Sequence, residues 1–179
     1  NLNGQVANRT LQILKDPRWS GISNKDLRDQ FAFTQEVKSK LEEVHNAIKK
    51  IRSVRSQVNT TAKMAVKNGF TEELKASAKV IDEKLTKLEE KLIQTKNESG
   101  QDPINYPPML DDQFAYLYSV SCFQDTKPTA GSYERFNDLK NELAPHLENL
   151  DKILGYEVTN FTKLLDKEKV PRIIEDEGR

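Results

Sequence analysis

The sequence has little of what builds reactive sites or tight turns. Its 179 residues include one cysteine, Cys122, and seven glycines. A lone cysteine excludes an internal disulfide framework and a thiolate metal cluster, and so few glycines argue against a strand-rich domain with many tight turns. No apolar run approaches the roughly 20 residues that span a bilayer, so we expect no membrane insertion. These absences favour a soluble helical domain.

The chain also has no excess of charge of either sign. Lys and Arg total 28, as do Asp and Glu, so the formal net charge is zero. A neutral chain has no global field that draws it onto nucleic acid or anionic lipid, and we expect no nucleic-acid partner. Charged residues make up 31% of the chain and hydrophobic residues 36%. This balance is typical of long helices with one narrow apolar stripe.

Catalytic and cofactor motifs are missing as well. The sequence contains no P-loop, GxGxxG, HExxH, CxxC or GxSxG pattern. His45 and His146 have no second ligand at helical spacing, and Cys122 is expected to be a small buried side chain. We therefore predict that this chain is not an enzyme and binds neither a cofactor nor a metal.

What the chain does have is heptad patterning on four segments. Ser23 is expected to cap the first helix, because Asp26 follows it three residues later in a near capping box. The apolar stripe of this helix fades near Val58. Thr71 caps the second, after a turn signal at Asn68 and Gly69, and this helix should end by residues 97–100. The inward positions of the first helix are predicted to be Leu27, Phe31, Thr34, Val37, Leu41, Val44, Ile48 and Ile51. Those of the second are Leu74, Ala78, Ile81, Leu85, Leu88 and Leu92.

The remaining two segments differ in length. A short third helix should begin at Pro107 or Pro108, with Leu110, Phe114, Leu117 and Ser121 facing inward. The last helix should begin near Thr129 or Ser132 and end at Pro171, with a kink over residues 141–145 because Pro145 lies inside it. Its predicted apolar stripe is Tyr133, Phe136, Leu139, Leu143, Leu147, Leu150, Leu154, Val158, Phe161 and Leu164.

These segments predict an all-α fold, an antiparallel four-helix bundle with three long helices and one short, over residues 23–170. One end of the bundle should be thinner, or be filled by the N-terminal segment and the loop before the short helix. Residues 171–179 would form a tail. Residues 1–22 are predicted to hold the trailing strand of an upstream domain, because residues 10–14 alternate apolar and polar and one strand is not stable alone. Loose packing of this segment on the bundle is the alternative.

The stretch "INYPPMLDDQFAYLY" (104–118) holds the candidate ligand or partner surface, Tyr106, Asp111, Asp112 and Tyr116. The aromatic side chains would form a groove for sugar or peptide, and the two carboxylates would form an acid pair. The simpler interpretation is structural: rings fill the volume that a short helix leaves open, and acids at a helix start complement its dipole. Likewise, the basic residues at 49–55 favour a solvated helix face over a phosphate site, because acidic residues 42–43 interrupt the same helix.

Two stretches also suggest a family. "LQILKDPRWSGISNKDLRDQFAF" (11–33) and "INYPPMLDDQFAYLYSVSCFQDTKPTAGSYERFNDL" (104–139) resemble the helical C-terminal region of bacterial proteins with sialidase-like BNR/Asp-box repeats, related to the sortilin-type β-propeller. The resemblance implies an extracytoplasmic setting (secreted, periplasmic or envelope-associated) and, as partners, upstream propeller and β-sandwich domains of the same protein. The Asp-box itself is absent here, so no catalytic residue is carried over.

Three functions are compatible with these observations. The first is a non-catalytic helical-bundle module at the C-terminus of a larger BNR-repeat, glycosyl-hydrolase-like protein, serving domain packing or protein interaction. The second is a free-standing coiled-coil-type oligomerisation or adaptor protein, indicated by the heptads of residues 71–98. The third is a carbohydrate-binding or hydrolytic role centred on Tyr106, Asp111, Asp112 and Tyr116.

Overall fold

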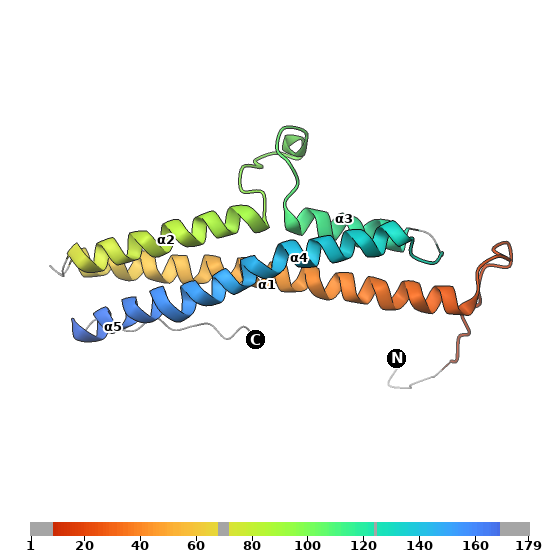
Figure 1. Cartoon of the computed structure of the whole chain (residues 1–179), viewed down its shortest axis with the longest axis horizontal. Helices are drawn as coiled ribbons and strands as arrows, with labels where there is room; N and C mark the ends of the chain where they lie inside the picture. The colour runs from red at the N-terminus through yellow and green to blue at the C-terminus, as the bar shows by residue number, and fades with distance from the viewer. Residues whose placement is uncertain (1–8, 68–71, 124, 169–179) are drawn as a thin grey trace, which may run out of the picture.

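A computed structural model describes residues 9–67, 72–123 and 125–168, and these form an all-helical bundle (Figure 1). The helices in chain order are α1 (Asn24–Lys67), α2 (Glu72–Leu92), α3 (Leu110–Cys122), α4 (Ala130–Lys152) and α5 (Thr159–Lys167). A 3-10 helix, η1 (Asp102–Ile104), precedes α3, and a π-helix, η2 (Ile153–Val158), joins α4 to α5. The predicted all-α helical bundle is confirmed.

The bundle is a rod in which α2 and α3 lie end to end. Figure 1 shows α1 along the length of the rod, with α4 and α5 running beside it in the same direction. α2 and α3 run in the opposite direction, and α1 packs against both of them. α2 covers one half of α1 and α3 the other, so neither end is thinner, contrary to the expectation from the sequence. The connection over residues 93–109 projects from the middle of the rod, where the Gln94 side chain donates to the carbonyl oxygen of Pro107 at 3.0 Å.

The capping residues that begin α1 and α4 are those that the sequence indicates. The Ser23 N–H donates to the Asp26 carboxylate at 2.9 Å, and the Asp26 N–H donates to the Ser23 hydroxyl at 3.2 Å. This reciprocal pair occupies donors that the first helical turn leaves free. Thr129 caps α4 with a single bond of this kind, accepting from the Ser132 N–H at 3.1 Å. By contrast, α3 begins at Leu110, two residues or more after the predicted prolines.

Helix α1 is longer than the pattern predicts. It contains 44 residues, or roughly 66 Å at 1.5 Å each, and continues to Lys67 rather than fading near Val58. Val58, Ala62 and Ala65 are all buried and carry the stripe onward. The inward face also differs at its start: Phe31 is 66% exposed, whereas Phe33 is 2% exposed and lies in the core.

Helix α2 follows its predicted seam throughout. All six expected residues, from Leu74 to Leu92, are buried, but the helix ends at Leu92, earlier than predicted. The turn and cap predicted at residues 68, 69 and 71 lie outside the described residues, as does the predicted helix end at Pro171. Leu110, Phe114 and Leu117 of α3 are buried as expected, and Ser121 is half-buried.

The π-helix changes the register of the last helix. Helix α4 is assigned without a break across Pro145, and the predicted kink stays a prediction. Beyond it, buried Ile153 is followed by buried Val158, five residues later. A π turn spaces residues at i and i+5 and so inserts one extra residue into an α-helix. Ile153 is therefore buried in place of the predicted Leu154, which is only half-buried. Further along, in α5, Leu165 is buried and the predicted Leu164 is half-buried.

A network of ion pairs joins α1 to α2. The Glu89 carboxylate, almost buried on α2, accepts from Arg52 at 2.6 Å and from Arg55 at 2.7 Å. Arg55 also donates to Asp82 at 3.1 Å, and Asn59 donates to the same carboxylate oxygen at 2.8 Å. Two of the basic residues at 49–55 are thus paired across the helix interface. Arg52 remains exposed, as expected for a solvated face, whereas Arg55 is half-buried between two carboxylates and departs from that interpretation.

The N-terminal segment finds no strand partner among the described residues, and its prediction as the trailing strand of an upstream domain stays a prediction. Residues 9–14 have no regular secondary structure, and no strand occurs among the described residues. Leu11 and Ile13 are largely exposed. A strand requires a hydrogen-bonded neighbour, and the described part of the chain offers none. A turn follows this segment, where the Asp16 carboxylate accepts from the Arg18 backbone N–H at 2.9 Å.

Candidate functional site

The structure separates the four residues predicted as a ligand surface. Asp112 and Tyr116 lie one turn apart on the outer side of α3 and line the same groove. Asp111 points into the bundle and is buried. Tyr106 precedes α3, is half-buried, and lies under the Lys96 ammonium at 5.9 Å from its ring centre. The aromatic groove proposed from the sequence is therefore reduced to one ring, that of Tyr116.

We call the hollow beside Tyr116 the outer groove. It lies between α3 and α4, has a volume of about 560 Å³, and is lined by Pro108, Asp112, Gln113, Tyr116, Leu117, Val120 and Arg135. Tyr116 is 72% exposed, and the Arg135 guanidinium donates to the Gln113 side chain. A single carboxylate, that of Asp112, lines the groove, whereas two cooperating carboxylates are the usual machinery of glycoside hydrolysis. This arrangement suits the holding of an apolar or sugar ring better than its cleavage.

Asp111 is buried at the start of α3 with incomplete hydrogen bonding. One of its carboxylate oxygens, Oδ1, has no hydrogen-bond partner among the described residues. Burial raises the pKa of Asp111, and the neighbouring Asp112 charge adds to the rise, while the Asp112 backbone N–H and His45 oppose it. Its ionised form is therefore less favourable in the folded protein than in the unfolded chain.

Replacing Asp111 with Asn is expected to stabilise the fold at neutral pH. Because the folded pKa of Asp111 is raised, its contribution to stability falls as the pH rises from below the unfolded pKa. We expect Asp111→Asn to raise the free energy of unfolding by about 1 kcal/mol at neutral pH, with the gain disappearing near pH 3. Urea unfolding at both pH values measures this, with Asp138→Asn, exposed on α4, as the control. A variant less stable than the wild type at neutral pH would contradict it.

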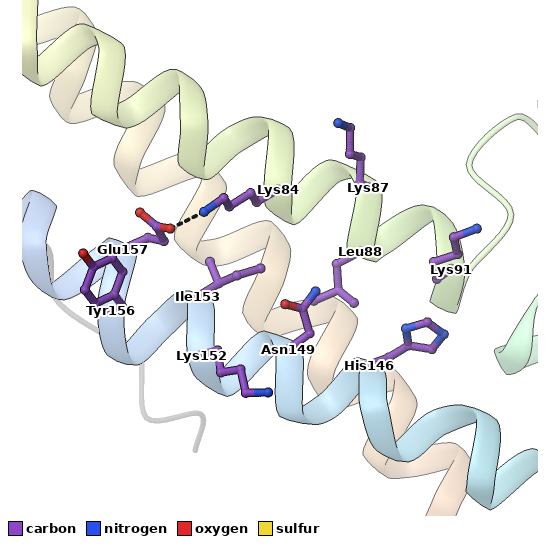
Figure 2. Close-up of a pocket in the computed structure, with 10 residues that line it drawn as sticks. All are labelled: Lys84, Lys87, Leu88, Lys91, His146, Asn149, Lys152, Ile153, Tyr156 and Glu157. Atoms are coloured by element: carbon purple, nitrogen blue, oxygen red, sulfur yellow. Dashed lines mark hydrogen bonds and ion pairs between the residues drawn. The ribbon is translucent and has the colours of Figure 1, made fainter.

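A second hollow lies between α2 and the α4–η2 helix (Figure 2). Lys84, Lys87 and Lys91 recur on α2 at positions i, i+3 and i+7, which places them on one face of that helix. We call this hollow of about 660 Å³ the lysine groove. Its ten lining residues are Lys84, Lys87, Leu88, Lys91, His146, Asn149, Lys152, Ile153, Tyr156 and Glu157. Leu88 and Ile153 are buried and form its floor.

The lysine groove is positively charged. Four lysines line it and only one carboxylate, that of Glu157, which pairs with Lys84. Within the described ranges of the chain, no carboxylate lies within ion-pair distance of Lys87, Lys91 or Lys152. Some lysines elsewhere are paired: Lys25, Lys38 and Lys79 each have an acidic partner four residues away, Asp29, Glu42 and Glu83 respectively. What distinguishes the groove is that its four lysines line one hollow.

His146 adds a titratable group to the same groove. Burial lowers its pKa, and nearby Lys91 lowers it further against the opposing charge of Glu142. The imidazole is thus neutral around neutral pH and offers one ring nitrogen as a hydrogen-bond donor. Asn149 lies beside it on α4, facing α2 in Figure 2. The groove therefore combines mobile cations with neutral donors.

Sequence reasoning missed the lysine groove. The three lysines at helical spacing on α2 were the available signal, but i, i+3, i+7 lysines are common on solvated helix faces. Lys152, His146 and Tyr156 lie more than 50 residues further along the chain, and only the packing of α4 against α2 brings them to the groove. Heptad patterning predicts which residues of a helix are buried, without indicating which helix lies beside it.

A third feature is a set of exposed apolar side chains, Ile13, Leu14 and Phe31, which we call the N-proximal apolar patch; Leu11 and Phe123, close to it in sequence, are also exposed. Ile13, Leu14 and Phe31 line one hollow of about 480 Å³ together with Cys122. The side chain of Gln30 donates to the carbonyl oxygen of Ser121 at 2.7 Å, which fixes the end of α3 beside the start of α1. Cys122 is exposed, so the prediction that it is buried is wrong.

The described residues contain neither a metal-binding cluster nor a membrane-spanning helix. No group of three or more His, Cys, Asp and Glu side chains there is placed to hold a metal ion. None of the described helices combines the length and the apolar character needed to cross a bilayer. Comparisons of the chain with family models, with curated proteins and with solved structures find no match.

Proposed function

We propose that this chain is a non-catalytic accessory module of a larger extracytoplasmic, BNR-repeat, glycosyl-hydrolase-like protein, in which it packs against a domain joined to its N-terminal side. The observation that supports this function is the N-proximal apolar patch. Large exposed apolar clusters mark surfaces that bind another protein surface. The resemblance of residues 11–33 and 104–139 to the C-terminal region of such proteins supports the identity of the parent.

The position of the patch favours a tethered neighbour as its occupant. Leu11, Ile13 and Leu14 belong to the segment that leads into α1, so a domain attached before them is held beside the patch at high effective concentration. The backbone of residues 9–14 makes no strand pairing with the described residues. An extended segment of this kind can add to the edge of a sheet in a neighbouring domain, as expected for the last strand of a β-sandwich.

Hydrogen exchange on the parent protein tests this function. We expect the amides of residues 9–15 and 120–123 to exchange at least about tenfold more slowly in a protein that includes the preceding domain than in the isolated chain. Substitution of Ile13 and Phe31 with Asp should remove that protection, whereas Tyr116→Asp in the outer groove should leave it unchanged. Equal exchange rates with and without the preceding domain would refute the docking, and a preceding sequence without Asp-box repeats would refute the parent family.

The oligomerisation alternative has less support, because its motivating residues are used within the chain. The heptad residues of α2 are all buried against the rest of the bundle, so they offer no free seam for a second chain. Self-association through the N-proximal apolar patch is the remaining form of this alternative. A concentration-dependent dimer in sedimentation, lost in the Ile13→Asp, Phe31→Asp double variant, would favour it over tethered docking.

The carbohydrate alternative rests on the outer groove. Tyr116 presents an exposed ring beside Asp112 and Arg135, the combination of an apolar face and polar rim that sugar rings prefer. The burial of Asp111 separates it from Asp112, so the structure supports binding more than hydrolysis. Titration with oligosaccharides, compared between the wild type and Tyr116→Ala, would distinguish this role from domain packing.

A further inference from the structure

Positive charge is concentrated at the lysine groove, although the chain as a whole is neutral. The whole chain is formally neutral, yet the groove has four lysines against one carboxylate. Lys25, Lys38 and Lys79 on other faces have acidic partners one turn away, which offset their charge locally. Lys87, Lys91 and Lys152 lack such partners within residues 9–67, 72–123 and 125–168. Unpaired ammonium groups around one hollow constitute an electrostatic site for an anion.

The dimensions of the groove limit the size of that anion. Its volume of about 660 Å³ lies within the roughly 300–1,000 Å³ range of small-molecule sites. Lys84 to Lys91 span seven residues of α2, a rise of about 10 Å. Lys152 lines the groove from α4, with its ammonium group directed away from α2 in Figure 2. A single phosphate cannot meet cations spread over that distance, whereas linked phosphates can meet several at once. Lysine is a frequent phosphate ligand, acting as a mobile point charge.

The side chains are not yet arranged around a ligand. In Figure 2 Lys84 reaches toward Glu157, and Lys87 and Lys91 point away from α4. Rotation about their flexible four-carbon stems would bring these ammonium groups over the groove. Asn149 and His146 already lie on the α4 wall as neutral donors. The π-helix η2 forms the far part of this wall and carries Tyr156 and Glu157; such turns occur frequently at functional sites.

From these observations we infer that the lysine groove binds a compact ligand bearing two or more linked phosphate groups. The ammonium groups of Lys87, Lys91 and Lys152 meet the phosphates, and Asn149 and His146 donate hydrogen bonds to them. Glu157 opposes binding, because it occupies Lys84 and repels the anion. This site is independent of the N-proximal apolar patch, so its existence does not depend on the proposed docking function.

Calorimetric titration of the folded chain with inorganic tripolyphosphate tests the site. We expect saturable binding at low salt that weakens severalfold when ionic strength approaches the physiological value, and orthophosphate should bind at least about tenfold more weakly. The Lys87→Ala, Lys91→Ala, Lys152→Ala triple variant should lose at least about tenfold in affinity. A control triple, Lys25→Ala, Lys38→Ala, Lys79→Ala, has the same net charge and should bind almost as the wild type does.

Glu157→Gln distinguishes a local site from a general charge effect. This substitution frees Lys84 and removes a negative charge from the groove, so affinity should rise about threefold. Asp29→Asn, at the partner of Lys25 near the start of α1, should change it little. Vesicles containing phosphatidylinositol bisphosphate identify the source: binding to them as well as to tripolyphosphate indicates a lipid headgroup, and binding to tripolyphosphate alone indicates a soluble ligand. Equal losses in the two triple variants, or no saturable binding by the wild type, would overturn the inference.

Discussion

Deletion of Gly155 is expected to leave the bundle folded, with a Tm within about 3 °C of the wild type or above it. Gly155 lies in the π-helix η2, which places buried Ile153 and Val158 five residues apart. Removal of one residue makes that spacing four, which an α-helix accommodates while keeping both side chains on the inner face. The deletion also removes an exposed helical glycine, which disfavours a helix by about 1 kcal/mol relative to alanine.

Deletion of Glu83 is the matched control, because this residue is also exposed but lies inside regular α-helix in α2. Loss of one residue there rotates half of the seam by about 100°, so either Leu74, Ala78 and Ile81 or the following leucines leave the core. We expect a fall in Tm of more than about 10 °C, measured by thermal circular dichroism on both deletions. Similar large losses in the two variants would show that η2 holds no removable residue.

Phe114→Ala is expected to destabilise the protein by about 3–5 kcal/mol. Phe114 is fully buried, and its ring centre lies 6.3 Å from that of Phe136, which in turn lies 5.5 Å from that of Phe33. These edge-to-face contacts join α3, α4 and α1 through one aromatic cluster. Helix α3 has only 13 residues and few other buried side chains, so the loss of this ring removes much of what holds it.

Urea unfolding measures the change in the free energy of unfolding, and hydrogen exchange shows which helices lose amide protection. Amides of α3 should lose protection before those of α2, because the two helices pack on different halves of α1. Tyr116→Ala, two residues along α3 but exposed, should change the free energy of unfolding by no more than about 0.5 kcal/mol. An equal loss of amide protection in α2 and α3 would contradict the expectation that Phe114 stabilises α3 independently of α2.

The sequence predicts burial best where apolar residues leave one choice of face. The α2 seam has leucine or isoleucine at regular steps with charged residues between them, and all its predicted residues are buried. At the start of α1, Phe31 and Phe33 are both apolar and two residues apart, so periodicity alone favoured the wrong one. The end of α1 was missed because its stripe continues through Ala62 and Ala65, whose small side chains give a weak signal.

Other differences arise from information that no local pattern contains. The extra residue in η2 shifts the inward face from Leu154 to Ile153, and a leucine beside an isoleucine gives no sign of which points inward. Asp111 and Asp112 look equivalent as a pair, yet the helical rotation of about 100° between neighbours buries one and exposes the other. The end-to-end placement of α2 and α3 depends on which helices pack together, which seam positions do not specify.

The connection between α2 and α3 makes the middle of the rod a place where the chain tolerates added length. Gln94 and Pro107 are hydrogen-bonded, so the loop leaves the bundle and returns at nearly the same point. The free-energy cost of closing a loop rises only slowly with the number of residues in it, by about 0.6 kcal/mol for each doubling of loop length. Extra residues, or a whole inserted domain, between these two positions would extend outward without changing the register of any helix. Relatives of this protein that differ in size therefore have room to differ here.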